Sequence, residues 1–361
     1  MAILKLVIAF ILSLSQFFSP IVALISNGGE KAFFDKWSAQ DDFNANSYIE
    51  LEKTPGEDFV VLNLADIQLG ESKLFAPAGE NSKALIDKMV ADMQPDLITL
   101  SGDNAWGTTA YIKLVEWIDS YGIPWAPVMG NHDGEDCPSE FWAAYLFYEA
   151  ENCLFEFGPE DMGYGNYIIN ITENGRIVHT LFMMDTHSSA SFTLPDGTVI
   201  EDSYDHLWPN QLEWYKWGVQ GTKKLAGHTV ESTVIMHIPV LEYRTAWAEA
   251  WDEEKGEFRP LYAFTSYGSN NEWICSSEVN NGFFDLCKDL GSTKNIIVGH
   301  DHANDSSILY KGIRLSYSVK TGFGSYWEAD KIGGTTVTIN SFGNAKVQNH
   351  YYDLEELGFE F

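Results

Sequence analysis

The segment Asp58-Phe-Val-Val-Leu-Asn-Leu-Ala-Asp-Ile-Gln68 decides the fold, because two polar side chains directly follow an apolar run. A short run rich in apolar and β-branched residues predicts a buried strand at 58–65. Asp66 and Gln68 then lie where the strand opens into a loop. Open α/β folds place their binding sites at this end of the strands. The segment therefore predicts an α/β sheet with a ligand site at one edge.

Four later segments repeat this arrangement of an apolar run followed by a polar block. The blocks are Gly102-Asp-Asn104, Gly130-Asn-His-Asp133, Met236-His-Ile-Pro239 and Gly299-His-Asp-His302. A single Asp or Asn after a strand is more typical of a turn or a helix cap. Five blocks in order, each at a predicted strand end, instead favour one shared site. Carboxylate, carboxamide and imidazole groups in this mixture suit two divalent cations.

At these residues the chain resembles the calcineurin-like metallophosphoesterases, from about Asp58 to Asp353. The segments 237–242, 275–283, 300–305 and 317–326 are similar to one branch of that superfamily, which holds plant purple-acid-phosphatase-like proteins and their fungal phosphatase relatives. The resemblance implies an α/β fold, a four-layer sandwich of two mixed β-sheets flanked by helices. It also implies hydrolysis of phosphoesters.

The same resemblance implies a centre of two divalent metal ions (Mn, Fe, Zn or Mg) that share a hydroxide able to attack phosphorus. The implied ligands are Asp66 and His302 for the first ion, Asn131, His237 and His300 for the second, and Asp103 between them. His132 is implied as the catalytic residue that stabilises the transition state or protonates the leaving oxygen. The expected substrate is a small phosphorylated molecule, and the expected activity is that of a phosphomonoesterase.

Two residues depart from the family pattern. Gln68 stands where the superfamily usually has a histidine, so we expect either a weak ligand of the first ion or a residue that caps the turn. Trp106 stands where purple acid phosphatases have the tyrosine that binds ferric iron, so the purple chromophore is not expected. Two other functions stay open: a phosphodiesterase acting on nucleotides or sphingomyelin-like head groups, and a catalytically weak metal-binding relative.

Composition and the chain ends bear on partners and location. The 361 residues carry a net charge of −30, which disfavours a nucleic-acid polymer as partner. Residues 1–23 are typical of a signal peptide, which predicts a secreted or vacuolar (lysosomal) protein; a signal anchor in a membrane is the alternative. We assign 24–56 to an N-terminal extension, 57–353 to the metallophosphoesterase domain and 354–361 to an acidic tail. No stable membrane span is expected elsewhere.

Further expectations concern elements, loops and modifications. Helices are predicted near 82–93, 110–121, 139–150 and 209–224, a hairpin at 167–184, and strands at 97–101, 124–129, 306–310, 312–318, 334–340 and 345–352. The insertions 186–207, with a turn at Pro195, and 240–280, rich in aromatic residues, are expected to shape substrate access. Sequons at Asn170 and Asn304 permit glycosylation. The cysteines predict disulfides Cys137–Cys153 and Cys275–Cys287, with four buried thiols as the alternative.

Overall fold

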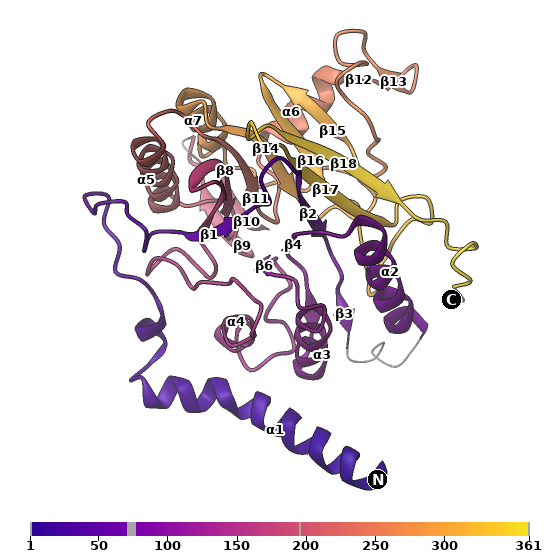
Figure 1. Cartoon of the computed structure of the whole chain (residues 1–361). Helices are drawn as coiled ribbons and strands as arrows, with labels where there is room; N and C mark the ends of the chain where they lie inside the picture. Colours follow the sequence, from indigo (N-terminus) through magenta and orange to yellow (C-terminus); the bar gives the residue numbers. More distant parts are fainter. Residues whose placement is uncertain (1, 71–76, 195, 360–361) are drawn as a thin grey trace.

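Two β-sheets form the centre of the molecule, and helices cover their outer faces (Figure 1). This computed structural model describes residues 2–70, 77–194 and 196–359. The five-stranded sheet has the order β18 (Ala345–Tyr351), β17 (Gly333–Ile339), β2 (Phe59–Leu64), β4 (Leu97–Ser101) and β6 (Trp125–Val128). Its strands β2, β4 and β6 are parallel, whereas β17 runs antiparallel to both of its neighbours.

The second sheet has seven strands and is also mixed. Its order is β1 (Ile49–Glu52), β7 (Tyr167–Glu173), β8 (Arg176–Met183), β11 (Glu231–Ile235), β14 (Thr293–Val298), β16 (Ile313–Tyr317) and β15 (Ser307–Tyr310). Strands β8, β11, β14 and β16 are mutually parallel, and β7 joins β8 as a hairpin. The expected α/β sandwich of two mixed sheets is therefore confirmed.

Alternating side chains of the seven-stranded sheet separate two cores. Leu181 and Met183 of β8 face the core between the sheets, whereas Phe182 belongs to the core beneath the outer helices. Ile235 and Val234 of β11 divide in the same way. Because successive strand residues point to opposite faces, an apolar run without interruption produces a sheet that is buried on both sides.

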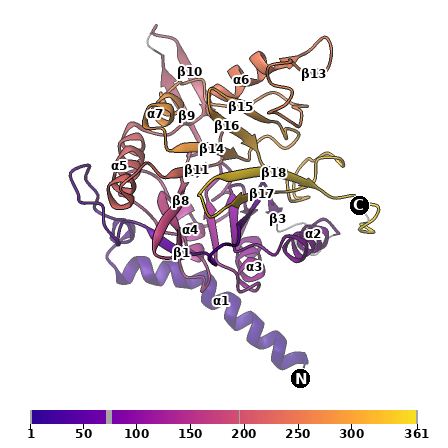
Figure 2. The same cartoon turned by 45° about the horizontal axis from the view of Figure 1, so that its top comes forward.

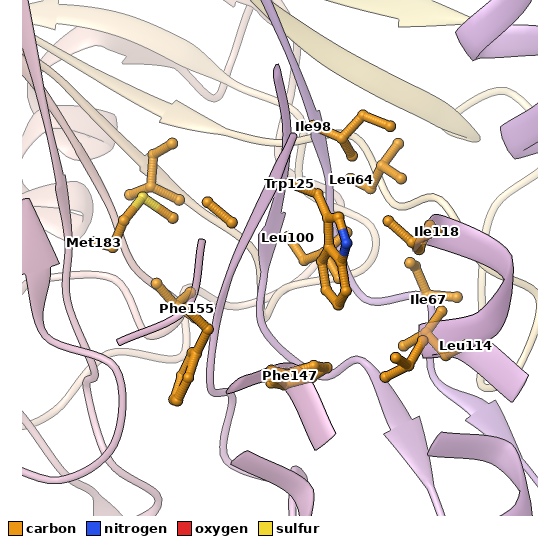
Figure 3. Packing of buried hydrophobic residues seen from close by; sticks show 14 of the residues in the cluster. Leu64, Ile67, Ile98, Leu100, Leu114, Ile118, Trp125, Phe147, Phe155 and Met183 are labelled. Atoms are coloured by element: carbon orange, nitrogen blue, oxygen red, sulfur yellow. The ribbon is translucent and has the colours of Figure 1, made fainter. Parts of the chain in front are cut away.

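The helices form the two outer layers, seen from a second direction in Figure 2. On the five-stranded side lie α2 (Pro77–Met93), α3 (Thr108–Asp119) and α4 (Glu140–Tyr148). On the seven-stranded side lie α5 (Pro209–Ala226), α6 (Glu242–Ala250) and α7 (Phe283–Leu290). Figure 3 shows Trp125 of β6 inside this packing, with the ring of Phe147 from α4 edge-on to it at 5.7 Å.

In the described part of the chain, a short 3-10 helix (Glu30–Phe33) and three short strand pairs lie outside the two sheets. The pairs are β3 (Leu69–Gly70) with β5 (Ala105–Trp106), β9 (Ser189–Thr193) with β10 (Val199–Tyr204), and β12 (Trp251–Asp252) with β13 (Glu257–Phe258). The pair β9–β10 lies in the insertion expected at 186–207; the turn expected at Pro195 is outside the described residues. Strand β1 lies in the extension at 24–56 and adds an edge strand, parallel to β7.

The N-terminal residues form α1 (Ala2–Ser26), which runs beneath α3 and α4 in Figure 1. The indole of Trp142 in α4 donates a hydrogen bond to the carbonyl oxygen of Phe17 over 3.0 Å. Among the described residues, no helix has both the length and the apolar character that crossing a bilayer requires. The signal peptide and the secreted location stay predictions.

The predicted disulfides are wrong, because no disulfide joins any of the four cysteines. The Cys287 thiol lies in the core beneath the outer helices, where burial raises its pKa to about 12. Cys275 instead lies in a loop, and its Sγ donates to the carbonyl oxygen of Trp273 over 3.3 Å. Cys153 pairs by backbone with Trp125 at the edge of β6, and burial raises the pKa of its thiol.

The two glycosylation sequons are not presented to solvent. Asn170 in β7 is fully buried and accepts a hydrogen bond from Thr180 over 2.7 Å. Asn304 is 2% exposed and donates to Asp301. An oligosaccharide needs an asparagine side chain that reaches solvent, so the folded chain does not offer either position to it.

Candidate metal centre

The five polar blocks meet at one edge of the sandwich, as their places after the strands predict. Asp66 and Gln68 follow β2, Asp103 follows β4, and Asn131 and His132 follow β6 of the five-stranded sheet. His237 follows β11, and His300 and His302 follow β14 of the other sheet. Since β2, β4 and β6 are parallel to one another, as are β11 and β14, the carboxyl ends of the strands bring these residues together.

His237 is the centre of one group of contacts. Its Nε2 lies 2.9 Å from Asn131 Oδ1, 3.3 Å from Asp103 Oδ1 and 3.2 Å from His300 Nδ1. Its other nitrogen, Nδ1, lies 2.9 Å from the Ser101 carbonyl oxygen. A carbonyl oxygen only accepts, so Nδ1 carries a proton, and Nε2 offers its lone pair when the ring is neutral. We call the group of Asp103, Asn131, His237 and His300 the His237 side.

These residues fit a divalent cation. Asp66, Asp103 and His237 each offer one ligand atom, and the three atoms lie within 4.8 Å of one another. Two imidazole nitrogens face each other across 3.2 Å, and His300 Nε2 is buried without a hydrogen-bond partner among the described residues. Potential ligand atoms that converge in this way, with one buried nitrogen left without a partner, suit a bound cation.

A second group, the His302 side, lies around Asp66. Asp66 Oδ1 is 3.5 Å from His302 Nε2, and both carboxylate oxygens accept from the backbone N–H of His300. His302 Nδ1 lies 3.1 Å from the Tyr326 carbonyl oxygen, which orients Nε2 towards Asp66. Gln68 completes this side, and its Nε2 lies 2.9 Å from Asp103 Oδ2.

The backbone at the centre is held in unusual conformations. Asp66, Gln68, Asp103 and His300 have positive φ angles of 51°, 46°, 51° and 78°. Residues with side chains rarely adopt this left-handed region, and such strain concentrates at functional sites. Gly102 has a φ of 90°, and a Cβ there would lie 2.6 Å from His237 Nδ1. Only glycine therefore fits before Asp103.

On the His237 side, the pKa of each titratable residue depends on the charge of its neighbours. Burial alone would lower the pKa of His237, but the carboxylates of Asp103 and Asp66 raise it to about 10. Burial would raise the pKa of Asp103, whereas the charge of His237 holds it well below its usual range. Burial and the charge of His237 lower the pKa of His300 to about 3. A cation bound here would displace a proton from His237, since only neutral imidazole is a ligand.

Two carboxylates within the motifs support the loops. Asp133 accepts from the backbone N–H groups of Gly130 and Asn104, 2.7 and 2.8 Å away, and from the Tyr111 hydroxyl. Burial and the nearby charge of Asp103 raise the pKa of Asp133 to about 6. Asp301 accepts from the Tyr317 hydroxyl over 2.6 Å. Their hydrogen bonds to these donors hold the ligand loops in place.

His132 is more exposed than Asp103, His237 and His300. Its side chain is 40% exposed, and Nδ1 lies 3.0 Å from Glu135 Oε1. Its backbone N–H donates to Asp103 Oδ1 over 2.9 Å. The Trp106 ring stands edge-on to the imidazole, with 5.6 Å between the ring centres. His132 thus borders the centre and is open to a substrate.

Two residues at the centre have no counterpart in the sequence predictions. Tyr204, at the end of β10, places its ring edge-on to His300 at 4.4 Å. Lys320, after β16, reaches Asp66 and Gln68 with its ammonium group. Lys320 lies in the segment 317–326 that resembles the family, which was the available signal; neither residue has a metal-ligand pattern. The insertion 186–207 thus contacts the centre through Tyr204.

Some aromatic residues of the insertion 240–280 pack together, and others are exposed. Trp247 stacks on Trp251 with ring centres 4.7 Å apart, and both pack against Phe258. Phe264 and Trp273 are instead 98% and 73% exposed. Glu272 accepts a hydrogen bond from Tyr326 over 2.7 Å, which joins this insertion to the loop beside His302.

An α/β sandwich with a buried Asp/Asp/His group at the strand ends defines a metallophosphoesterase. The chain belongs to the family described as calcineurin-like phosphoesterase, whose model matches residues 59–304. It is similar to a protein of Arabidopsis thaliana named probable inactive purple acid phosphatase 14, at 28% identity over 273 residues. The aligned region covers 68% of this chain and 63% of that protein. The relation to plant purple-acid-phosphatase-like proteins is thereby confirmed, as a distant homology.

A yeast protein and a solved structure are also similar. Phosphatase DCR2 of Saccharomyces cerevisiae is 27% identical over 281 residues, which cover 71% of this chain and 46% of that protein. The chain thus spans less than two thirds of the length of both curated relatives. A dimetal phosphatase from Danio rerio is 12% identical with a TM-score of 0.49, covering 80% of this chain and 98% of that chain.

Proposed function

We propose that this chain is a divalent-metal-dependent phosphoric ester hydrolase and, within that class, a phosphomonoesterase for a small phosphorylated substrate. The observation that carries the proposal is the buried group of Asp66, Asp103 and His237, whose ligand atoms lie within 4.8 Å of one another. The family model and the name of the yeast phosphatase support it. A bound cation would also attract a phosphate to a protein whose net charge is −30.

Some residues would hold the cation, and others orient the residues that hold it. A divalent cation, when bound, would supply Lewis acidity to a phosphoryl oxygen and lower the pKa of a coordinated water. Asp103, Asn131, His237 and His300 would hold that cation. Ser101 fixes the His237 ring through Nδ1, and Tyr326 fixes the His302 ring in the same way. Two ligand rings are therefore oriented before a cation arrives.

His132 is positioned to transfer a proton. Its imidazole is 40% exposed beside Asp103, and Glu135 lies 3.0 Å from Nδ1. A carboxylate beside Nδ1 favours the tautomer with a proton on that nitrogen. We infer that the opposite nitrogen, Nε2, donates a proton to the leaving oxygen of the substrate, which is general acid catalysis.

One observation favours a second candidate, a metal-binding relative with weak catalysis. Both polar ends of the Gln68 side chain are engaged by protein groups, and the Arabidopsis relative carries the word inactive in its name. Partial loss of metal binding on the His302 side would lower turnover without loss of the fold.

Turnover of two chromogenic esters separates these functions. Wild-type protein loaded with Mn²⁺ is assayed with 4-nitrophenyl phosphate and bis(4-nitrophenyl) phosphate, and metal content is measured on the same sample. We expect the monoester to be hydrolysed faster and chelation to abolish the reaction. Faster hydrolysis of the diester would identify a phosphodiesterase. Retained metal with no turnover of either ester would indicate the weak relative.

A further inference from the structure

A buried lysine lies against the His302 side. Lys320 is only 2% exposed, and its Nζ donates to the carbonyl oxygen of Asp66 over 2.8 Å and to Gln68 Oε1 over 2.9 Å. Burial of an ammonium is costly unless it is compensated, so this position is maintained by specific partners.

The contact with Lys320 fixes the orientation of Gln68. An ammonium group only donates hydrogen bonds, so the carboxamide oxygen must face Lys320. The amide nitrogen then faces Asp103 and donates to Oδ2 over 2.9 Å. Gln68 thus presents N–H groups, rather than its oxygen, to the space beside Asp103. An N–H donor cannot bind a cation.

The main chain leaves little room to rearrange this contact. Lys320 pairs by backbone with Ala65, and Thr321 donates to the Ala65 carbonyl oxygen over 2.8 Å. A Cβ at Gly322 would lie 1.9 Å from the Ile67 carbonyl oxygen, and one at Gly324 would lie 1.6 Å from that of Gln68. The segment 320–324 is therefore packed directly on 66–68, with Lys320 held against Gln68.

The two sides of the centre consequently differ in their fitness for a cation. On the His237 side, Asn131 Oδ1, Asp103 Oδ1 and His300 Nδ1 all lie within 3.3 Å of His237 Nε2, so four potential ligand atoms converge there. On the His302 side, Asp66 and His302 remain as acceptors, but Gln68 turns its N–H groups inward and an ammonium ion lies behind it. A fixed positive charge and a lost ligand both weaken cation binding there.

We propose that this protein binds one divalent cation tightly, through Asp103, Asn131, His237 and His300, and that the Lys320–Gln68 pair takes the place of a ligand on the His302 side. A second cation binds there only weakly. The carboxamide of Gln68 is then a hydrogen-bond bridge between Lys320 and Asp103, and not a metal ligand. This inference concerns metal stoichiometry and stands whether or not the protein turns over a phosphoester.

Metal titration of the wild-type protein is the primary test. Metal-free protein is titrated with Mn²⁺ by equilibrium dialysis, and the electron paramagnetic resonance spectrum is recorded at one and two equivalents. We expect one tight equivalent with the six-line spectrum of an isolated Mn²⁺ ion, and a second equivalent weaker by at least about tenfold. Two equivalents of similar affinity, with a spin-coupled spectrum at low occupancy, would overturn the proposal.

Two variants test whether the Lys320–Gln68 pair causes the difference in affinity between the first and the second Mn²⁺ equivalent. Lys320→Met removes the charge and keeps an unbranched side chain, and the double variant with Gln68→His also supplies an imidazole. We expect second-equivalent affinity to rise in Lys320→Met and to rise further in the double variant. Lys53→Met is the matched control, because Lys53 is also 2% exposed but pairs with Glu173 at 3.4 Å, in contact with β7.

Lys53→Met should leave the affinities for the first and the second Mn²⁺ equivalent unchanged. If Lys320→Met and the double variant fold but bind the second cation no more tightly than wild type, the proposal fails. If either variant fails to fold, the wild-type spectrum at one and two equivalents still decides the matter. Loss of ester turnover with one tight equivalent retained would count against the proposed enzyme function alone.

Discussion

At the scale of single residues, the centre depends on glycines that leave room for ligand side chains. A Cβ at Gly299 would lie 2.6 Å from Asp66 Oδ2. We expect Gly299→Ala to displace this carboxylate, to weaken metal binding and to lower the free energy of unfolding by about 1–3 kcal/mol. Gly70→Ala is the control, because its Cβ would meet Trp106 at an ordinary 3.8 Å. Calorimetric metal titration and urea unfolding measure both effects; equal metal affinities in the two variants would contradict this assignment.

His132 illustrates a residue whose backbone and side chain have separate roles. The backbone N–H holds Asp103 Oδ1, whereas the imidazole faces solvent. His132→Ala should therefore retain metal and stability but lower kcat on the best substrate by about 10²–10⁴. His228→Ala, which removes an exposed histidine after α5, should leave kcat unchanged. Steady-state kinetics with metal analysis checks this, and an unaltered kcat in His132→Ala would remove the side chain from catalysis.

The sequence was informative about the metal ligands but not about Lys320, the buried lysine that contacts Gln68. Asp103, His237 and His300 could be predicted because each follows an apolar strand in a recognisable block. Lys320 could not, because its contact with Gln68 joins positions 252 residues apart. A lone lysine in a loop carries no local pattern that distinguishes a buried ammonium from a solvated one. Its role depends on which segments the two sheets bring together.

At the scale of elements, continuous apolar runs located β2, β4, β11 and β14 correctly. Strand β1 was not predicted, because Ile49-Glu-Leu-Glu52 is short and alternates between half-buried and exposed residues at a sheet edge. Its pairing with β7 is long-range, and such pairing leaves little local signal. The disulfides failed because closeness in sequence does not bring two thiols together: Cys287 lies in the core beneath the outer helices, whereas Cys275 lies in a loop.

His179 of β8 links elements in a way that should depend on pH. It is fully buried, with Nδ1 2.8 Å from the Gly343 carbonyl oxygen between β17 and β18, and Nε2 3.0 Å from Thr233 Oγ1 of β11. Burial lowers its pKa to about 4, although the bond to Gly343 opposes this shift. In the unfolded chain the pKa is about 6.5, so the unfolded state binds more protons between these values.

The contribution of the neutral His179 ring to the free energy of unfolding is therefore fully present above about pH 6.5, and it is lost as the pH falls towards 4. The loss amounts to at most about 3 kcal/mol. His179→Gln should flatten the dependence of unfolding free energy on pH across this window, whereas His228→Gln should not. Urea unfolding at several pH values provides the measurement, and parallel profiles for wild type and His179→Gln would refute the assignment.

At the scale of the whole molecule, the metal centre joins the two sheets. Asp66, Asp103 and Asn131 come from the five-stranded sheet, and His237 and His300 from the seven-stranded sheet. A cation bound by both acts as a cross-link present only in the folded state. At a concentration a hundred times Kd it should add about 2.7 kcal/mol to the free energy of unfolding.

Chelation should consequently lower the Tm by several degrees, and re-addition of Mn²⁺ should restore it. Asp103→Asn should show a much smaller response, because a neutral amide attracts a cation less strongly than a carboxylate. Differential scanning calorimetry with and without chelator tests this. A Tm independent of metal in the wild-type protein would mean that the ligands do not clamp the sheets together.

The proposed function depends on a divalent cation that residues from both sheets bind through Asp103. Elemental analysis of wild type and Asp103→Asn, purified together and dialysed against limiting Mn²⁺, tests it most directly. We expect about one tightly bound equivalent in the wild type and loss of most of it in the variant. Equal metal content in the two proteins, or none in the wild type, would contradict the account.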